Sequence, residues 1–193
     1  MTPCIGIRRE DEKLLERRAP LTPEQVRTLT EDHAIDVQVQ PSDTRAIAEQ
    51  EYVQAGAKIS EDLSACPVIF GLKEIPVQEL LSDKVYIFFS HTIKGQSYNM
   101  EMLNRILQLG CTLIDYETIT DPDGRRLIFF GRHAGLAGMI ETLSALGKRL
   151  SWEGIHNPFE KIRRPVEYPD LATAKAKIAR AGRKLASKGL PQS

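Results

Sequence analysis

Charged and titratable side chains follow four apolar, strand-like runs of this sequence. Arg8 to Lys13 follow the first run, Lys73-Glu74 the second, Ser90-His91 the third and Asp115-Tyr116-Glu117 the fourth. In open α/β sheets, ligands bind beyond the carboxyl ends of the strands. If these four strands are parallel, the charged residues meet at one edge of a sheet and form a candidate site.

Two of these residues, Lys73 and His91, have side chains that can move protons. A lysine against a buried strand end loses hydration, which lowers its pKa and makes it a candidate base. A histidine on a neighbouring strand can act as the matching acid near neutral pH. Nearby arginines offer forked donors for carboxylates, and a glutamate can hold an ammonium group or tune the lysine. The pattern therefore predicts an enzyme whose substrate carries carboxylates and an amine.

Short apolar runs alternate with helical patterns and indicate the elements that position these residues. Thr22-Pro23-Glu24-Gln25 is a helix start with an N-cap, an early proline and a capping-box glutamine. Because the strands are apolar and alternate with helices, we expect a parallel sheet covered on both faces. The expected strands are Cys4–Ile7, Ile35–Val39, Pro67–Leu72, Val85–Phe89, Thr112–Ile114 and Leu127–Phe130, and the other expected helices are Ile47–Ala55, Met100–Leu107, Ala134–Leu150 and Leu171–Ser187.

The pattern changes near residue 135, where strands give way to long helices. We expect a flavodoxin-like (Rossmann-like) open parallel sheet over residues 1–135 and a C-terminal helical extension over residues 136–193. The last helical pattern carries an apolar stripe, which we expect to pack on a further domain or to form a homodimer with a second copy. The stripe consists of Leu171, Ala174, Ile178, Ala181 and Leu185.

Composition limits the class of protein. The 193 residues suffice for one full domain and part of a second. Because the net charge is zero and no apolar run reaches the length of a membrane span, we expect neither nucleic acid nor membrane as a partner. The three cysteines have no metal-ligand spacing, so we expect reduced packing residues, no metal and a cytoplasmic location.

Several motifs resemble a known family, in family order and across essentially the whole chain. The run from Glu16 to Pro23 (ERRAPLTP) resembles the opening motif of the alanine dehydrogenase and transhydrogenase N-terminal fold. Four further runs narrow the resemblance to the saccharopine dehydrogenase and lysine–ketoglutarate reductase branch. They are Gly71–Glu74 (GLKE), Phe88–Gln96 (FFSHTIKGQ), Ile114–Glu117 with Asp123–Arg126 (IDYE and DGRR), and Gly131–Gly138 (GRHAGLAG).

This resemblance implies a role for individual residues. It implies that Lys73 is the base in the oxidative direction, that His91 is the acid and that Glu117 tunes charge. It further implies that Arg18, Gln96 and Arg126 contact substrate carboxylates, that Phe130 lines the pocket and that Arg125 touches the nicotinamide dinucleotide. The implied reaction is NAD- or NADP-dependent interconversion of saccharopine with lysine and 2-oxoglutarate.

The cofactor should be bound mainly outside this chain. A dinucleotide-binding turn needs closely spaced glycines, and none of the 13 glycines here is separated from another by a single residue. We therefore expect a missing nucleotide-binding domain and no dehydrogenase activity from this chain alone. Two alternatives are an alanine- or opine-dehydrogenase-like enzyme acting on another 2-oxo acid, and a non-catalytic ligand-binding module that has kept the fold.

Overall fold

The computed structural model describes residues 3–11, 16–189 and 191, apart from the side chain of Lys188. Glu12 and Lys13, which belong to the first charged run, lie outside the described residues. The chain divides into two compact units, Met1–Ile128 and Phe129–Ser193, so the division falls a few residues before the boundary that we expect at residue 135.

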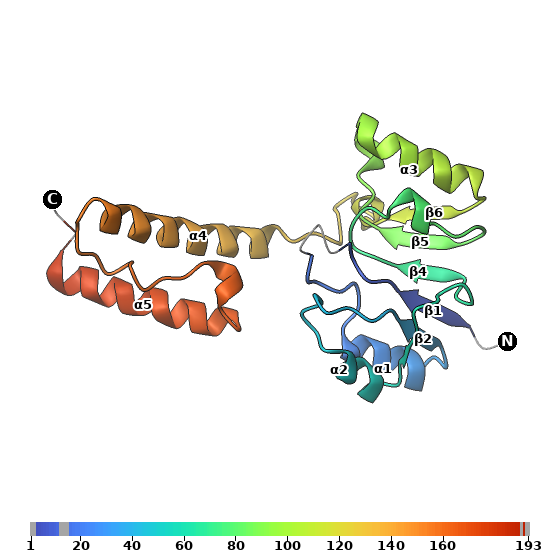
Figure 1. Cartoon of the computed structure of the whole chain (residues 1–193), viewed down its shortest axis with the longest axis horizontal. Coiled ribbons are helices and arrows are strands. Elements are labelled where there is room, and N and C mark those ends of the chain that lie inside the picture. Colours follow the sequence, from blue (N-terminus) through green and yellow to red (C-terminus); the bar gives the residue numbers. More distant parts are fainter. Residues whose placement is uncertain (1–2, 12–15, 190, 192–193) are drawn as a thin grey trace. The chain divides into compact units, whose positions relative to one another are not determined.

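The first unit is built on an open sheet of six parallel strands in the order β3-β2-β1-β4-β5-β6 (Figure 1). The strands are β1 (Cys4–Ile7), β2 (Asp36–Val39), β3 (Lys58–Ile59), β4 (Val68–Phe70), β5 (Val85–Phe88) and β6 (Thr112–Asp115). The sheet grows outward from β1 in both directions, which is the doubly wound arrangement that the alternating pattern predicts. The predicted fold class is confirmed.

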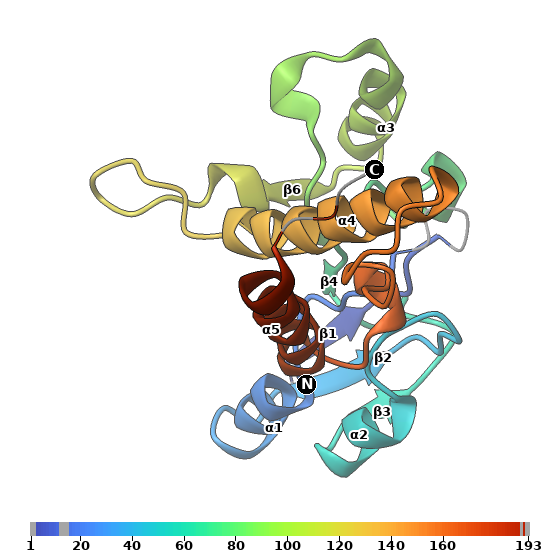
Figure 2. The same ribbon diagram turned by 90° about the vertical axis from the view of Figure 1, so that its left-hand side faces the viewer.

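Helices cover both faces of this sheet. On one face, Val26 of α1 (Pro23–Glu31) and Tyr52 of α2 (Glu49–Gln54) pack against Ile7, Val37 and Val39. On the other face, the buried side of α3 (Ser97–Gln108) packs against β4 and β5. Figures 1 and 2 show α1 and α2 beside β2, and α3 near the opposite end of the sheet. Short 3₁₀ helices among the described residues of this unit follow strands, namely η2 (Val77–Glu79), η3 (Thr92–Lys94) and η4 (Tyr116–Thr118).

Capping residues and glycines mark the ends of the helices α1, α2 and α3. Thr22 accepts a hydrogen bond from the Gln25 amide, and the Gln25 side chain returns one to Thr22, so the expected capping box is confirmed. Gly56 and Gly110, which follow α2 and α3, have the positive φ angles that glycine tolerates best. No helix among the described residues combines the length and the apolar composition that crossing a membrane requires.

Two details of the sheet differ from the expectations. The expected strand Leu127–Phe130 is wrong, because this run lies largely exposed between an isolated antiparallel bridge (Thr120 with Arg126) and the next helix. Its apolar composition resembles that of a buried strand, but the run lies where the chain passes from the first unit to the second. β3 was not expected, since two residues with half-polar character give no periodic signal.

The second unit contains α4 (Gly131–Trp152), the short 3₁₀ helix η5 (Pro165–Glu167) and α5 (Leu171–Lys188). Ile140 on α4 and the buried Phe159 and Ile162 pack against Ala174 and Ala181 on α5. The apolar stripe of α5 therefore packs largely within its own unit, and it offers no bare helix face to a second copy. The homodimer remains a prediction, and the packing of this stripe does not support it.

Two adjacent residues on α3 provide a matched test of the packing of α3 against β4 and β5. Ile106 is 1% exposed and Leu107 is 66% exposed. Replacing Ile106 with alanine leaves a cavity and should lower the free energy of unfolding by roughly 2–5 kcal/mol. Leu107→Ala should change it by less than about 0.5 kcal/mol. Urea unfolding followed by circular dichroism measures both, and equal losses for the two variants would contradict this packing.

Candidate active site

The four strands that precede the charged runs are neighbours in the sheet. β1, β4, β5 and β6 are adjacent and parallel, so the residues after them meet at one edge, as the sequence predicts. From β1 the chain leads to β2 on one side and later returns to form β4 on the other, which makes the ends of β1 and β4 the topological switch point where ligands bind in open α/β sheets. Lys73 follows β4 and His91 follows β5, the strand next to it.

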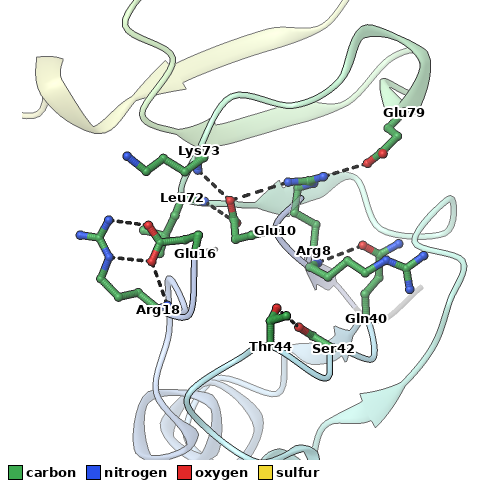
Figure 3. Close-up of polar contacts among 11 residues, drawn as sticks. Arg8, Glu10, Glu16, Arg18, Gln40, Ser42, Thr44, Leu72, Lys73 and Glu79 are labelled. Atoms are coloured by element: carbon green, nitrogen blue, oxygen red, sulfur yellow. Dashed lines mark hydrogen bonds and ion pairs between the residues drawn. The ribbon is translucent and has the colours of Figure 1, made fainter. Parts of the chain in front are cut away.

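A buried carboxylate fixes the backbone at Lys73. Glu10, which follows β1 and is 6% exposed, accepts hydrogen bonds from the amides of Leu72 (2.8 Å) and Lys73 (2.9 Å). These amides extend beyond the last strand residue of β4 and have no partner within the sheet. Figure 3 shows both Glu10 oxygens facing this turn, with the Lys73 side chain extending away from it. Glu10 therefore sets the direction in which the Lys73 side chain leaves the strand.

Glu10 is held in turn by Arg8, which is 5% exposed. Arg8 Nη1 lies 3.8 Å from Glu10, an ion-pair distance too long for a hydrogen bond, and Arg8 Nη2 donates to Glu79 at 2.8 Å. Burial raises the pKa of Glu10 above its ordinary value, while Arg8 and the two amides oppose this shift. Glu79, Arg8 and Glu10 thus form a line of alternating charge beneath the turn at Lys73 (Figure 3).

Arg18 already holds a carboxylate. Its Nε and Nη2 donate to Glu16 at 2.8 and 2.6 Å, in the two-point geometry that arginine uses for carboxylates. This pairing keeps the pKa of Glu16 below its ordinary value, and the charge of Lys73 adds a smaller contribution in the same direction. Lys73 and Arg18 thus lie near the same carboxylate, on the same side of the strand end (Figure 3).

His91 pairs with Glu74, the residue after Lys73. The His91 Nδ1 and Glu74 Oε1 atoms are 2.5 Å apart, and both side chains are partly exposed. His91 has a φ angle of 53°, a left-handed conformation that is uncommon outside glycine and is often found at functional sites. Its ring stacks on Phe89, which in turn contacts Tyr116. Glu74 therefore joins the turn after β4, which also carries Lys73, to the turn after β5, and we call the charged residues at these strand ends the cluster.

Asp115 supports the turn that carries His91. It is 6% exposed and accepts hydrogen bonds from both the amide and the hydroxyl of the fully buried Ser90. Its other oxygen accepts from the amide of Glu117 at 2.8 Å. One carboxylate therefore ties the end of β5 to the end of β6, and this places Glu117 beside the residues that follow His91.

Glu117 and Arg126 pair with each other. Glu117 Oε1 lies 3.2 Å from Arg126 Nη1 and 3.8 Å from Lys94 Nζ. Glu117 Oε2 is buried and has no hydrogen-bond partner in the described chain. A buried oxygen of this kind is costly to leave unpaired, so it is a natural acceptor for an ammonium group of a ligand.

The other three expected residues are Gln96, Arg125 and Phe130. Gln96 is exposed at the N-cap of α3, where it accepts a hydrogen bond from Tyr98 (2.6 Å) rather than from a member of the cluster. Arg125 is exposed in the turn that begins at Asp121. Phe130 belongs to the second unit, directly before α4. Their expected contacts with a ligand remain predictions.

A separate hollow of about 310 Å³ lies beside Arg8 and is lined by residues such as Gln40, Glu61, Ile69 and Tyr86. Neither Lys73 nor His91 lines it, so this hollow is separate from the strand ends that carry these two residues. Within the described residues, no three His, Cys, Asp or Glu side chains are arranged to hold a metal ion.

Sequence reasoning gave no specific role to Glu10, Glu16 or Glu74. Glu10 was visible only as a member of a charged run, Glu16 only as the first residue of the ERRAPLTP motif, and Glu74 only as the neighbour of Lys73. A signal did exist for Glu16, because a glutamate two residues before an arginine can reach it within one turn of chain. No signal existed for Glu10, whose partners lie 62 and 63 residues away.

Known proteins resemble this chain along nearly its whole length. It is 40% identical over 191 residues to the alpha-aminoadipic semialdehyde synthase, mitochondrial, of Mus musculus, which covers 99% of this chain and 20% of that protein. It is 40% identical to the Arabidopsis thaliana alpha-aminoadipic semialdehyde synthase, covering 97% of this chain and 18% of the relative. The NAD(+), L-lysine-forming saccharopine dehydrogenase of Emericella nidulans is 31% identical, over 93% of this chain and 49% of the relative.

The chain spans at most about half the length of these relatives. The mouse relative is named as mitochondrial, so the cytoplasmic location expected for this chain remains a prediction. Residues 6–137 match the family model described as alanine dehydrogenase/PNT, N-terminal domain, which extends from within β1 through the rest of the parallel sheet to the start of α4. This chain therefore belongs to the alanine dehydrogenase/PNT N-terminal domain family.

Proposed function

We propose that this chain is the substrate-side part of an oxidoreductase that interconverts saccharopine with lysine and 2-oxoglutarate, using NAD or NADP. The observation that carries the proposal is the meeting of charged residues at the ends of adjacent parallel strands, where Lys73 and Glu74 follow β4 and His91, which pairs with Glu74, follows β5. The similarity to saccharopine dehydrogenases and alpha-aminoadipic semialdehyde synthases supports the choice of substrates.

The cations of the cluster suit a substrate with several carboxylates. Arg18 and Arg126 are each about half exposed, and each already pairs with one internal carboxylate. In our proposal, substrate carboxylates join or replace these internal partners, so the arginines are oriented before the ligand arrives. In the same proposal, Glu117 Oε2 accepts a hydrogen bond from the substrate amine. The roles of Gln96 and Phe130 rest on the resemblance to the family alone.

Lys73 and His91 move the protons. Joining an amine to a ketone requires the amine to lose a proton and the carbonyl oxygen to leave as water, and the reverse reaction requires the opposite transfers. In our proposal, Lys73 takes a proton from the substrate nitrogen in the oxidative direction and His91 exchanges a proton with the oxygen. Glu74 orients the imidazole through its contact with Nδ1.

The nicotinamide dinucleotide would supply the hydride transfer, and the protein contributes orientation and proton transfer. The described residues fit only the edge of such a cofactor. Arg125 is an exposed cation in the turn after β6, so it suits a contact with a phosphate or ribose. No two glycines of this sequence are separated by a single residue, which agrees with a second domain that binds most of the dinucleotide.

Calorimetry on this chain tests the choice of substrate. We expect saccharopine and 2-oxoglutarate to bind more tightly than alanine, because they offer more carboxylates to the arginines. Arg126→Ala should weaken 2-oxoglutarate binding by roughly 10- to 100-fold, the worth of a charge-assisted hydrogen bond. Arg125→Ala is the neighbouring control and should leave that binding unchanged without cofactor. A preference for alanine, or equal losses for both variants, would reject the proposal.

Turnover tests the proton-transfer roles, in the presence of the nucleotide-binding domain. Lys73→Met and His91→Gln should each lower kcat by roughly 10²- to 10⁴-fold and change saccharopine binding far less. Lys58→Met and His33→Gln replace exposed residues of the same types away from the cluster and serve as controls. If the Lys73 and His91 variants keep normal turnover, the two residues do not carry the proton transfer.

Hydrogen exchange tests the support beneath Lys73. In Glu10→Gln, one of the two oxygens becomes an amide donor, so the amide of Leu72 or Lys73 loses its acceptor. We expect faster exchange at these two amides and a loss of roughly 1–3 kcal/mol in the free energy of unfolding. Glu101→Gln, at an exposed position on α3, is the control. Unchanged exchange at both amides would mean that Glu10 does not hold this turn.

A further inference from the structure

Two cysteines that are far apart in sequence meet at the edge of the sheet opposite the candidate site. Cys4 is the first residue of β1, and Cys66 stands two residues before β4. β1 and β4 are paired in parallel with Ile5 opposite Val68, so both cysteines lie at the amino-terminal ends of adjacent strands. Their Sγ atoms are 2.7 Å apart, longer than the roughly 2.05 Å of a disulfide, and both are free thiols.

The two thiols differ in access. Cys66 is fully buried, whereas Cys4 is partly exposed. The third cysteine, Cys111, stands before β6, where its thiol donates to the Leu81 carbonyl oxygen at 3.1 Å. A reagent from solution therefore meets Cys4 before Cys66, and Cys111 has no cysteine next to it among the described residues.

We propose that Cys4 and Cys66 form a dithiol redox site, which a low-molecular-weight disulfide such as oxidised glutathione converts into an intramolecular disulfide. The Cys4 thiolate attacks one sulfur of the oxidant, which forms a mixed disulfide on Cys4 and releases one thiolate. The Cys66 thiolate then attacks Cys4 Sγ, which forms the Cys4–Cys66 bond and releases the second thiolate. The two protein thiols lose two protons and two electrons, and the oxidant becomes two thiols.

The order of attack follows from the surroundings of the two sulfur atoms. Burial and the contact with Cys4 raise the pKa of Cys66 to about 12, so its thiolate is scarce at neutral pH. Of the charges facing Cys66, Lys84 opposes this shift and Asp62 adds to it. Cys66 is therefore a poor first nucleophile. Its position beside Cys4 makes the second step intramolecular, which compensates for the small thiolate fraction.

The bond would join the amino-terminal ends of β1 and β4 covalently. Arg8, Glu10 and Lys73 follow the carboxyl ends of the same two strands. The bond closes a loop between residues 62 positions apart, which contains α1, β2, α2 and β3. Closing a loop of this length removes conformational entropy from the unfolded chain, so oxidation should stabilise the first unit. The site is independent of the proposed enzymatic reaction.

Mass spectrometry of the native chain tests this inference. After incubation with oxidised glutathione, the chain should lose the mass of two hydrogen atoms. The thiols that can be alkylated in denaturant should fall from three to one, leaving Cys111, and dithiothreitol should restore all three. Three remaining thiols, a lasting glutathione adduct on the wild-type chain, or a disulfide that involves Cys111 would overturn the proposal.

Two variants separate the steps. Cys66→Ser should trap one glutathione on Cys4, because the second nucleophile is missing. Cys111→Ser should still form the disulfide and serves as the matched control. If Cys66→Ser takes up no glutathione while the wild-type chain forms the bond, Cys4 is not the first nucleophile. Should Cys66→Ser fail to fold, the wild-type chain and Cys111→Ser still decide whether the bond forms.

Discussion

The candidate site depends on one buried carboxylate, that of Glu10, which accepts hydrogen bonds from two backbone amides that lie beyond the end of a strand. At the end of β4, the amides of Leu72 and Lys73 have no strand partner, and Glu10 accepts hydrogen bonds from both. An unpaired buried amide costs about as much as a lost hydrogen bond, so this contact determines whether the turn is held in one conformation. The charge of Glu10 is itself buried, and it depends on Arg8 and, through Arg8, on Glu79.

Internal carboxylates also hold both arginines and the imidazole of the cluster. Glu16 holds Arg18, Glu74 holds His91 and Glu117 holds Arg126. These pairs reduce the rotamer freedom of the long side chains before a ligand binds, so less entropy is lost on binding. They also keep the cluster close to neutral, and a ligand that brings both carboxylates and an amine can exchange partners without leaving a charge unpaired.

Much of the fold followed from the sequence, and the site followed in part. Alternating apolar runs and helix signals such as Thr22–Gln25 gave the parallel sheet, and the residues after each strand gave Lys73 and His91. Leu127–Phe130 was wrong because apolar composition does not reveal whether a strand neighbour exists. Glu10 was missed because a contact over 62 residues depends on the register between β1 and β4, which no local pattern encodes.

We propose that Lys73 and His91 act together at adjacent strand ends on a ligand held by Arg18 and Arg126. A crystal structure of this domain, joined to its nucleotide-binding domain and containing saccharopine, tests it most directly. The account predicts that the secondary amine lies within hydrogen-bond reach of Lys73 Nζ or the His91 ring, with carboxylates on the arginines. Saccharopine bound instead in the hollow lined by Gln40, Glu61 and Tyr86, away from both side chains, would contradict it.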